Sequence, residues 1–358
     1  MSSNGTRLPA EVDAAPGEKR QTRYEIGETY LGDPVAIPVT VMNGAAPGPT
    51  ICLTAAIHGD ELNGVKVIQE VVDQYDPADI HGRMVCLHVC NVPAYEAQQR
   101  YTPIYDQDMN RSFPGSSRGQ PTSRMANTIY NGFIRHADMC LDFHTSTRHR
   151  TTIYHVRADL QDSAVNRLTR AFGTSVVLDG EGEAGTLRTV ATADGTPTIT
   201  VEMGRGHCFQ PDLIEKASEG VESVLAEYGM LPDHPVHWPG WYTTTDADTT
   251  KRWLRADIGG LVEMHWGPYP LVRSGDTICR ITNHFGTEEQ LIEAPFDGLI
   301  VGSLENPVVA PGHPVCHLLR LDAANLDEIQ REIARGEFDG YQISPAVWHA
   351  DTPDASES

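Results

Sequence analysis

A histidine and two carboxylates follow directly after an apolar segment near the start of the chain. Residues 49–57 read PTICLTAAI, and His58, Gly59, Asp60 and Glu61 come next. His58 and Glu61 are three residues apart, a spacing that can place both side chains on one side of a single turn. Imidazole nitrogens and carboxylate oxygens are common zinc ligands. For this pair alone, a metal site and a polar cap at a helix start are equally good interpretations.

Two later apolar segments end in the same kinds of side chain. Residues 140–143 are followed by His144, and residues 198–201 are followed by Glu202. In open α/β sheets, ligands bind outside the carboxyl ends of the strands, so side chains at these ends can meet. His144 would then join the first pair in a set of two histidines and one carboxylate. That is the ligand count of a catalytic zinc ion with one position left for water, and it makes Glu202 an additional carboxylate.

Two aspartates lie close to these candidates in the sequence. Asp60 is interpreted as a carboxylate at a helix start, and its replacement of Glu61 as a metal ligand is the alternative. Asp142 precedes His144 by two residues on the same expected strand. Asp142 is therefore a candidate to hydrogen-bond the imidazole and orient it toward a metal.

The segment DMNRSFPG adds an amide and a guanidinium in a loop between a strand and a helix. Asn110 and Arg111 stand next to each other in this segment. Together they offer several donors that can bind a carboxylate. An isolated Asn-Arg pair in a loop is more often solvated surface, so the pair needs support from other motifs.

The elements that must position these residues follow a repeating order. Apolar, strand-like runs occur at residues 49–57, within residues 82–100, and at residues 137–146, 174–180 and 196–204. Helical spacing occurs at residues 61–75, 123–137, 163–173 and 211–229. This alternation predicts an α/β fold with parallel strands in the sheet and helices on both faces. Residues 24–44 alternate like an edge strand or a hairpin.

The chain has a different pattern at each end. Residues 1–25 are polar and rich in Gly, Pro and charge, which predicts a disordered leader. We expect a catalytic domain at residues 26–236 and a small all-β domain at residues 237–325, because short segments with frequent turns replace the helical spacing there. A helix and an acidic tail are expected at residues 326–358.

The composition excludes several classes of partner. The formal net charge of −22 disfavours binding to nucleic acid or to anionic lipid. The sequence has no apolar stretch near the ~20 residues of a membrane-spanning helix and shows no signal peptide, which predicts a cytoplasmic protein. A homo-oligomer is compatible with the sequence. The seven cysteines contain no CxxC pair and are expected to be buried.

The basic residues are almost all arginine, since lysine occurs only at positions 19, 66, 216 and 251. A surface rich in Asp and Glu and poor in Lys suits solubility at high salt. A halophilic host is one interpretation, and an ordinary acidic cytosolic enzyme is the other.

Four short motifs, taken in their order along the chain, resemble those of a known family. The segments HGDELNG, DMNRSFPG, DFHT and VEMG occur in this order and resemble the succinylglutamate desuccinylase/aspartoacylase family, which has a zinc carboxypeptidase-like fold. The similarity covers about residues 38–231. Within the family, the chain looks most like the subgroup of small-molecule N-acyl amino acid deacylases that includes diaminobutyrate deacetylases. The resemblance implies a mixed sheet with helices on both faces and a C-terminal β domain beside the active site.

The resemblance also implies a metal and a base. His58, Glu61 and His144 match the family's ligands for one Zn²⁺ per chain. Glu202 matches its general base. The implied reaction is hydrolysis of the amide bond of a small N-acyl amino acid by metal-activated water, in which Glu202 moves the proton.

Four further residues are candidates on the substrate side. Asn110 and Arg111 match the family's pair that binds the substrate carboxylate. Arg100 is the best match for an arginine that polarises the scissile carbonyl, although it stands farther upstream than in aspartoacylase. Arg188 is a candidate substrate contact without a motif.

Other activities stay open at this point. A zinc carboxypeptidase, an esterase on small substrates and a non-catalytic metal-binding homologue are the alternatives. The segment at residues 291–318 also resembles a biotinyl or lipoyl carrier barrel. A carrier would need a lysine for its cofactor, and no lysine follows Lys251. The histidines at positions 265, 284, 313 and 317 are expected to be surface or packing residues rather than ligands.

Overall fold

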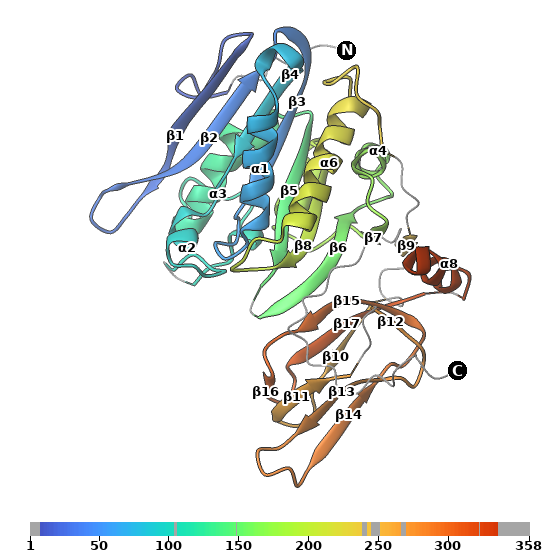
Figure 1. Ribbon diagram of the computed structural model, residues 1–358. Coiled ribbons are helices and arrows are strands. Elements are labelled where there is room, and N and C mark those ends of the chain that lie inside the picture. Colours follow the sequence, from blue (N-terminus) through green and yellow to red (C-terminus); the bar gives the residue numbers. More distant parts are fainter. Residues whose placement is uncertain are drawn as a thin grey trace.

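The protein folds around one large mixed sheet, with a second, smaller sheet near the C-terminus (Figure 1). The structure is a computed structural model that describes residues 8–103, 106–147, 149–237, 242–244, 251–265, 270–321 and 323–335. Among these residues no helix is long and apolar enough to cross a membrane. The expected α/β class, with an additional antiparallel sheet near the C-terminus, is confirmed.

The strands of the α/β part are β1 (Glu18–Glu28), β2 (Pro34–Asn43), β3 (Ala46–Ala55), β4 (His81–Leu87), β5 (Met139–Ser146), β6 (Arg150–Ala158), β7 (Val176–Asp179), β8 (Thr198–Arg205) and β9 (Tyr242–Thr244). The later strands are β10 (Lys251–Arg255), β11 (Gly260–Met264), β12 (Leu271–Val272), β13 (Thr277–Thr282), β14 (Glu289–Glu293), β15 (Gly298–Leu304), β16 (Val308–Val309) and β17 (Pro314–Arg320). The helices are α1 (Asn63–Gln74), α2 (Val92–Glu96), α3 (Pro121–Gly132), α4 (Ser163–Phe172), α5 (Leu187–Ala193), α6 (Pro211–Glu227) and α8 (Ala323–Arg335). Short 3-10 turns lie at Pro77–Asp79, Met109–Arg111 and Ile134–His136.

The large sheet has parallel strands at its centre. Its main path runs β1-β2-β4-β3-β5-β8-β6-β15-β17-β10, and β3 is parallel to both β4 and β5, as β5 is to β8. The carboxyl ends of β3, β5 and β8 therefore lie at the same edge of the sheet. This is the arrangement that the candidate ligands require.

Helices cover both faces of the parallel strands, and the strand residues alternate between the two cores. Leu53 on β3 packs in one apolar cluster with residues of α1, α4 and α6. Its neighbour Cys52 packs in a second cluster with residues of α3 and α5. This alternation is the period of two that a strand buried on both faces must have.

The predicted disordered leader is wrong for residues 8–25. Val12 is completely buried against the second core, and the chain from Glu18 forms β1, an edge strand paired with β2. Edge strands tolerate charged side chains because one side of the strand faces solvent. A polar edge strand and a disordered segment therefore have the same kind of composition here. Residues 1–7 lie outside the described part of the chain.

The C-terminal strands divide between two sheets. Strands β11, β13, β14 and β16 form the separate antiparallel sheet. Strands β10, β15 and β17 instead extend the large sheet, because β15 pairs antiparallel with β6. The large sheet therefore continues across the expected domain boundary at residue 237. The expected C-terminal helix is α8, and the expected acidic tail lies outside the described residues.

Candidate functional site

The turn after β3 is held by two glycines that allow very close packing. A Cβ atom on Gly59 would lie 2.0 Å from the carbonyl carbon of Ala94, at the start of α2. A Cβ atom on Gly64, in the first turn of α1, would lie 2.4 Å from Cβ of Phe143 on β5. Gly59 lets the turn between β3 and α1 approach α2, and Gly64 lets it approach β5. The side chains of His58 and Glu61 are thereby placed beside the end of that strand.

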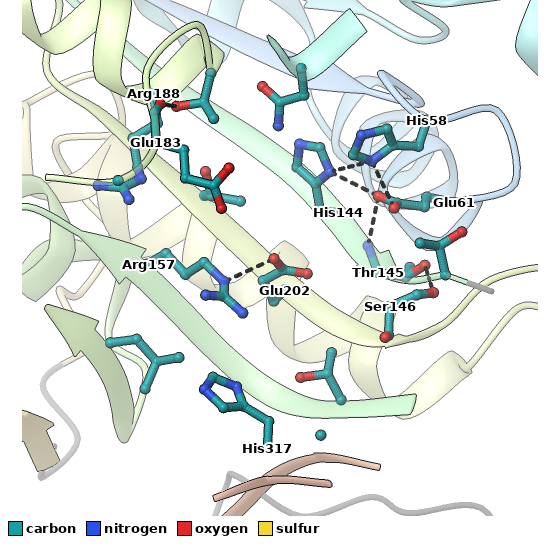
Figure 2. A pocket seen from close by; sticks show the side chains of 18 of the residues that line it. His58, Glu61, His144, Thr145, Ser146, Arg157, Glu183, Arg188, Glu202 and His317 are labelled. Carbon is teal, nitrogen blue, oxygen red and sulfur yellow. Dashed lines mark hydrogen bonds and ion pairs between the residues drawn. The ribbon is translucent and has the colours of Figure 1, made fainter. Parts of the chain in front are cut away.

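The three candidate metal ligands meet at one point (Figure 2). Nδ1 of His58 is 2.8 Å from Oε1 of Glu61, and Nδ1 of His144 is 2.8 Å from Oε2 of the same carboxylate. The two Nδ1 atoms are 3.2 Å apart. All three side chains are buried, and they are the one group of three or more potential metal ligands found within the described residues.

Each histidine has a carboxylate on its other ring nitrogen. Nε2 of His144 is 2.8 Å from Oδ2 of Asp142, and Nε2 of His58 is 3.1 Å from Oδ1 of Asp108. Such partners fix the imidazole tautomer and direct the second nitrogen at a metal. The predicted contact of Asp142 with His144 is confirmed. Asp108 was missed, although it stands two residues before Asn110 in the quoted motif.

The charges of the group support one another. Burial would raise the pKa of Glu61, but His58 and His144 outweigh burial and hold that pKa below its ordinary value. Burial would lower the pKa of His144, but Asp142 and Glu61 raise it well above its ordinary value.

The donor set fits a zinc ion. Tetrahedral ligands about 2.0–2.1 Å from a metal are about 3.3 Å from one another, close to the separations found here. With the protons on the Nε2 atoms, the Nδ1 lone pairs of His58 and His144 face the same point as the Glu61 carboxylate. A metal ion at this point would take the place of the proton that Asp142 and Glu61 favour on His144 by raising its pKa.

All eight residues predicted for the site line one cavity of about 840 Å³. These residues are His58, Glu61, Arg100, Asn110, Arg111, His144, Arg188 and Glu202. The structure therefore brings together residues that are separated by up to 144 positions in the sequence. Their individual roles remain predictions.

Glu202 lies beside the candidate metal ligands His58, Glu61 and His144, here called the metal group, because of strand register. His144 on β5 is the direct partner of Glu202 on β8, so the two residues are neighbours across adjacent parallel strands. Oε1 of Glu202 accepts a hydrogen bond of 3.0 Å from Nε of Arg157, a β6 residue that sequence reasoning missed. In Figure 2, Glu202 points into the same space as His144.

Arg100 is close to the metal group. Its Nη1 atom is 3.4 Å from Oε1 of Glu61 and 3.3 Å from Nδ1 of His58. Its Nη2 atom donates to Oδ2 of Asp108 over 3.1 Å. A guanidinium held here can interact with a carbonyl oxygen bound next to the metal group, which is the role expected of Arg100.

The expected substrate-binding residues lie on another wall of the cavity. Oδ1 of Asn110 accepts from the backbone N–H of Leu187, at the start of α5. Arg111 donates from Nη1 to the carbonyl oxygen of Asn110 and forms a 2.8 Å ion pair from Nη2 to Glu183. Arg188 is buried and donates to the carbonyl oxygen of Gly180, and burial lowers the pKa of its guanidinium to about 10.

The helix-start role predicted for Asp60 is wrong. Helix α1 begins after Leu62 and has no side-chain cap. The Asp60 carboxylate instead accepts from Oγ1 of Thr147, across the turn after β5, and lies 3.8 Å from Nε2 of His207. Asp60 therefore bonds to a distant segment of the chain instead of capping the start of α1.

The C-terminal strands contribute a wall of the cavity that sequence reasoning missed. His317 on β17 and Trp253 on β10 line the cavity, with their rings stacked 4.5 Å apart. Burial, Arg157 and Lys251 lower the pKa of His317 to about 3, so its imidazole is neutral. The stacking agrees with the expected packing role of His317, but its place in the cavity could be found only from the pairing of β15 with β6.

Comparison with known families decides the affiliation. Residues 47–228 match the succinylglutamate desuccinylase/aspartoacylase catalytic domain, over half of the chain. The chain belongs to this family. In this family of deacylases, the His58, Glu61 and His144 group forms a candidate metal site.

One curated relative and several solved structures are similar to this chain. The N-alpha-acetyl-L-2,4-diaminobutyric acid deacetylase of Halomonas elongata is 27% identical over 261 residues, which are 69% of this chain and 74% of the relative. A succinylglutamate desuccinylase structure from Silicibacter sp. TM1040 superposes with a TM-score of 0.78 at 23% identity, covering 90% of this chain and all of the other. The product-bound ectoine utilization protein EutE (DoeB) from Ruegeria pomeroyi superposes with a TM-score of 0.76 at 24% identity, covering 87% and 97%. The structural likenesses show a shared fold.

Proposed function

We propose that this protein is a zinc-dependent deacylase that hydrolyses the amide bond of a small N-acyl amino acid. The observation that carries the proposal is the buried group of His58, Glu61 and His144, with Glu202 in direct register beside His144. A zinc ion held by these three ligands would polarise an acyl carbonyl and lower the pKa of a bound water.

The protein's own residues would then divide the work. Glu202 accepts a proton from the attacking water and returns it to the leaving nitrogen, a task that suits a carboxylate at the edge of the metal group. Arg100 stabilises the negative charge that develops on the carbonyl oxygen. Asn110, Arg111 and Arg188 bind the carboxylate of the substrate on the other wall of the cavity.

The relative from Halomonas elongata supports a more specific substrate. Its name describes removal of an acetyl group from an acetylated diaminobutyrate. We propose N-acetylated 2,4-diaminobutyrate, or a close analogue, as the substrate here, with one zinc per chain. A cytoplasmic location and a halophilic host are part of the same proposal.

The test is the variant Glu202→Gln, assayed for release of acetate and for metal content. Glu305→Gln is a matched control, because the two side chains are equally exposed at 16% and each pairs with an arginine within 3.1 Å. We expect Glu202→Gln to lose turnover and keep its zinc, and Glu305→Gln to keep both. Turnover retained in Glu202→Gln would refute the proposal, and so would failure of the zinc-loaded wild type to hydrolyse any small N-acyl amino acid.

A further inference from the structure

We propose that Glu183 recognises an ammonium group on the side chain of the substrate. The inference rests on the proposed deacylase function and names the residue that distinguishes an N-acyl amino acid with a basic side chain from one with an apolar side chain. Glu183 lies in the loop of residues 180–186, between β7 and α5, and both Glu183 and Arg111 line the cavity.

The loop is packed directly against the two arginines that we assign to the substrate carboxylate. A Cβ atom on Gly182 would lie 2.4 Å from Nη2 of Arg188, and a Cβ atom on Gly185 would lie 2.5 Å from the carbonyl oxygen of Arg111. Both glycines have positive φ, at 91° and 79°. The backbone N–H of Phe113 also donates to the carbonyl oxygen of Gly185 over 3.1 Å. The position of the loop is therefore set by the arginines it touches.

This packing places the Glu183 carboxylate next to Arg111, which we assign to the carboxylate of the substrate. Oε2 of Glu183 is 2.8 Å from Nη2 of Arg111. The Glu183 side chain is 73% exposed, so its carboxylate is open to a ligand in the cavity. Figure 2 shows Glu183 extending from the side of Arg188 toward Glu202. A substrate could place its carboxylate on Arg111 and its ammonium on Glu183. Each of its charges would then lie beside a side chain of opposite charge.

The other acidic residues on this wall are less suited to the role. Asp179 is buried, and its Oδ1 atom accepts from the backbone N–H of Leu160. Glu181 also lines the cavity, and its backbone carbonyl accepts a hydrogen bond from Oγ1 of Thr189. The carboxylate paired with Arg111, however, is that of Glu183. Glu183 is thus the carboxylate of this wall that lies directly beside the site assigned to the substrate carboxylate.

Two substrates of equal shape separate charge recognition from simple packing. N-acetyl-2,4-diaminobutyrate ends in an ammonium, and N-acetylnorvaline has a methyl group in its place. Glu183→Gln should lower kcat/KM for the first by about fivefold, the upper range for an exposed ion pair. The value for N-acetylnorvaline should stay the same or rise, because Arg111 loses a competing partner. Glu181→Gln, in the same loop, is the control and should change neither value.

Binding calorimetry with both ligands reports the same difference without turnover. An inactive wild type would refute the amide-hydrolysis proposal, and the affinities would still test Glu183. Equal losses for both ligands would show that Glu183 only holds Arg111 in place and would overturn the inference. An unchanged preference for the cationic ligand in Glu183→Gln would overturn it as well.

Discussion

Replacing Asp142 by asparagine should weaken metal binding while leaving all three ligands in place. Asp142 is completely buried and holds Nε2 of His144 at 2.8 Å. Its other oxygen accepts from Oγ1 of Thr54 at 2.7 Å. The carboxylate fixes the proton on Nε2 and makes Nδ1 a stronger ligand. An amide of the same shape keeps the geometry and removes the negative charge.

The size of the expected loss in zinc affinity follows from the role of carboxylates that hydrogen-bond a metal-bound histidine. Removing a carboxylate behind a metal-bound histidine typically costs 10- to 100-fold in metal affinity. This corresponds to about 1.4–2.7 kcal/mol of binding free energy. We expect the Asp142→Asn variant to fall in this range, because no second carboxylate contacts Nε2 of His144 among the described residues.

The assay is competition for zinc between the protein and a chelating dye at fixed pH. Asp138→Asn is the control, since Asp138 is an exposed residue just before β5 that accepts from the backbone N–H of Thr50. The control should bind zinc as the wild type does. If Asp142→Asn binds zinc with unchanged affinity, Nδ1 of His144 is not a metal ligand and the reasoning fails.

Two further outcomes are expected. Because the fold keeps His317 neutral with a pKa of about 3, and the unfolded chain protonates histidine below about pH 6.5, its contribution to stability is full above pH 6.5 and is lost as the pH falls toward 3. The free energy of unfolding in urea should therefore fall less steeply between pH 6.5 and 4 in His317→Gln than in the wild type, and equal slopes would contradict the assignment. If the acidic, lysine-poor surface is an adaptation to high salt, the melting temperature should rise strongly from dilute buffer to molar KCl, because the salt screens the repulsion of a net charge of −22. A melting temperature that does not change would remove the halophile interpretation.

Short-range spacing, together with the order of strands and helices, was enough to predict the core of the candidate site. His58 and Glu61 share one turn, and Asp142 and His144 share one strand face, so local geometry alone limits where these side chains can point. The order of strands and helices predicted parallel strands, whose carboxyl ends meet at one edge. The spacing and this edge together predicted that His144 and Glu202 would join the first pair.

Long-range contacts decided what the sequence could not. The partner of a carboxylate depends on which distant segment packs against it, as Asp60 with Thr147 and Asp108 with His58 show. The loop that carries Glu183 is placed by its packing on Arg111, 72 positions earlier in the chain.

The sequence by itself therefore determined the types and local spacing of the chemical groups, and with them the donor set of the candidate metal site. The tertiary structure alone decided how the cavity around that site is completed. His317 enters the cavity because β15 pairs with β6 and brings β17 and β10 alongside the strands that carry the candidate site. Strand pairing of this kind joins residues more than 100 positions apart, and no local pattern specifies it.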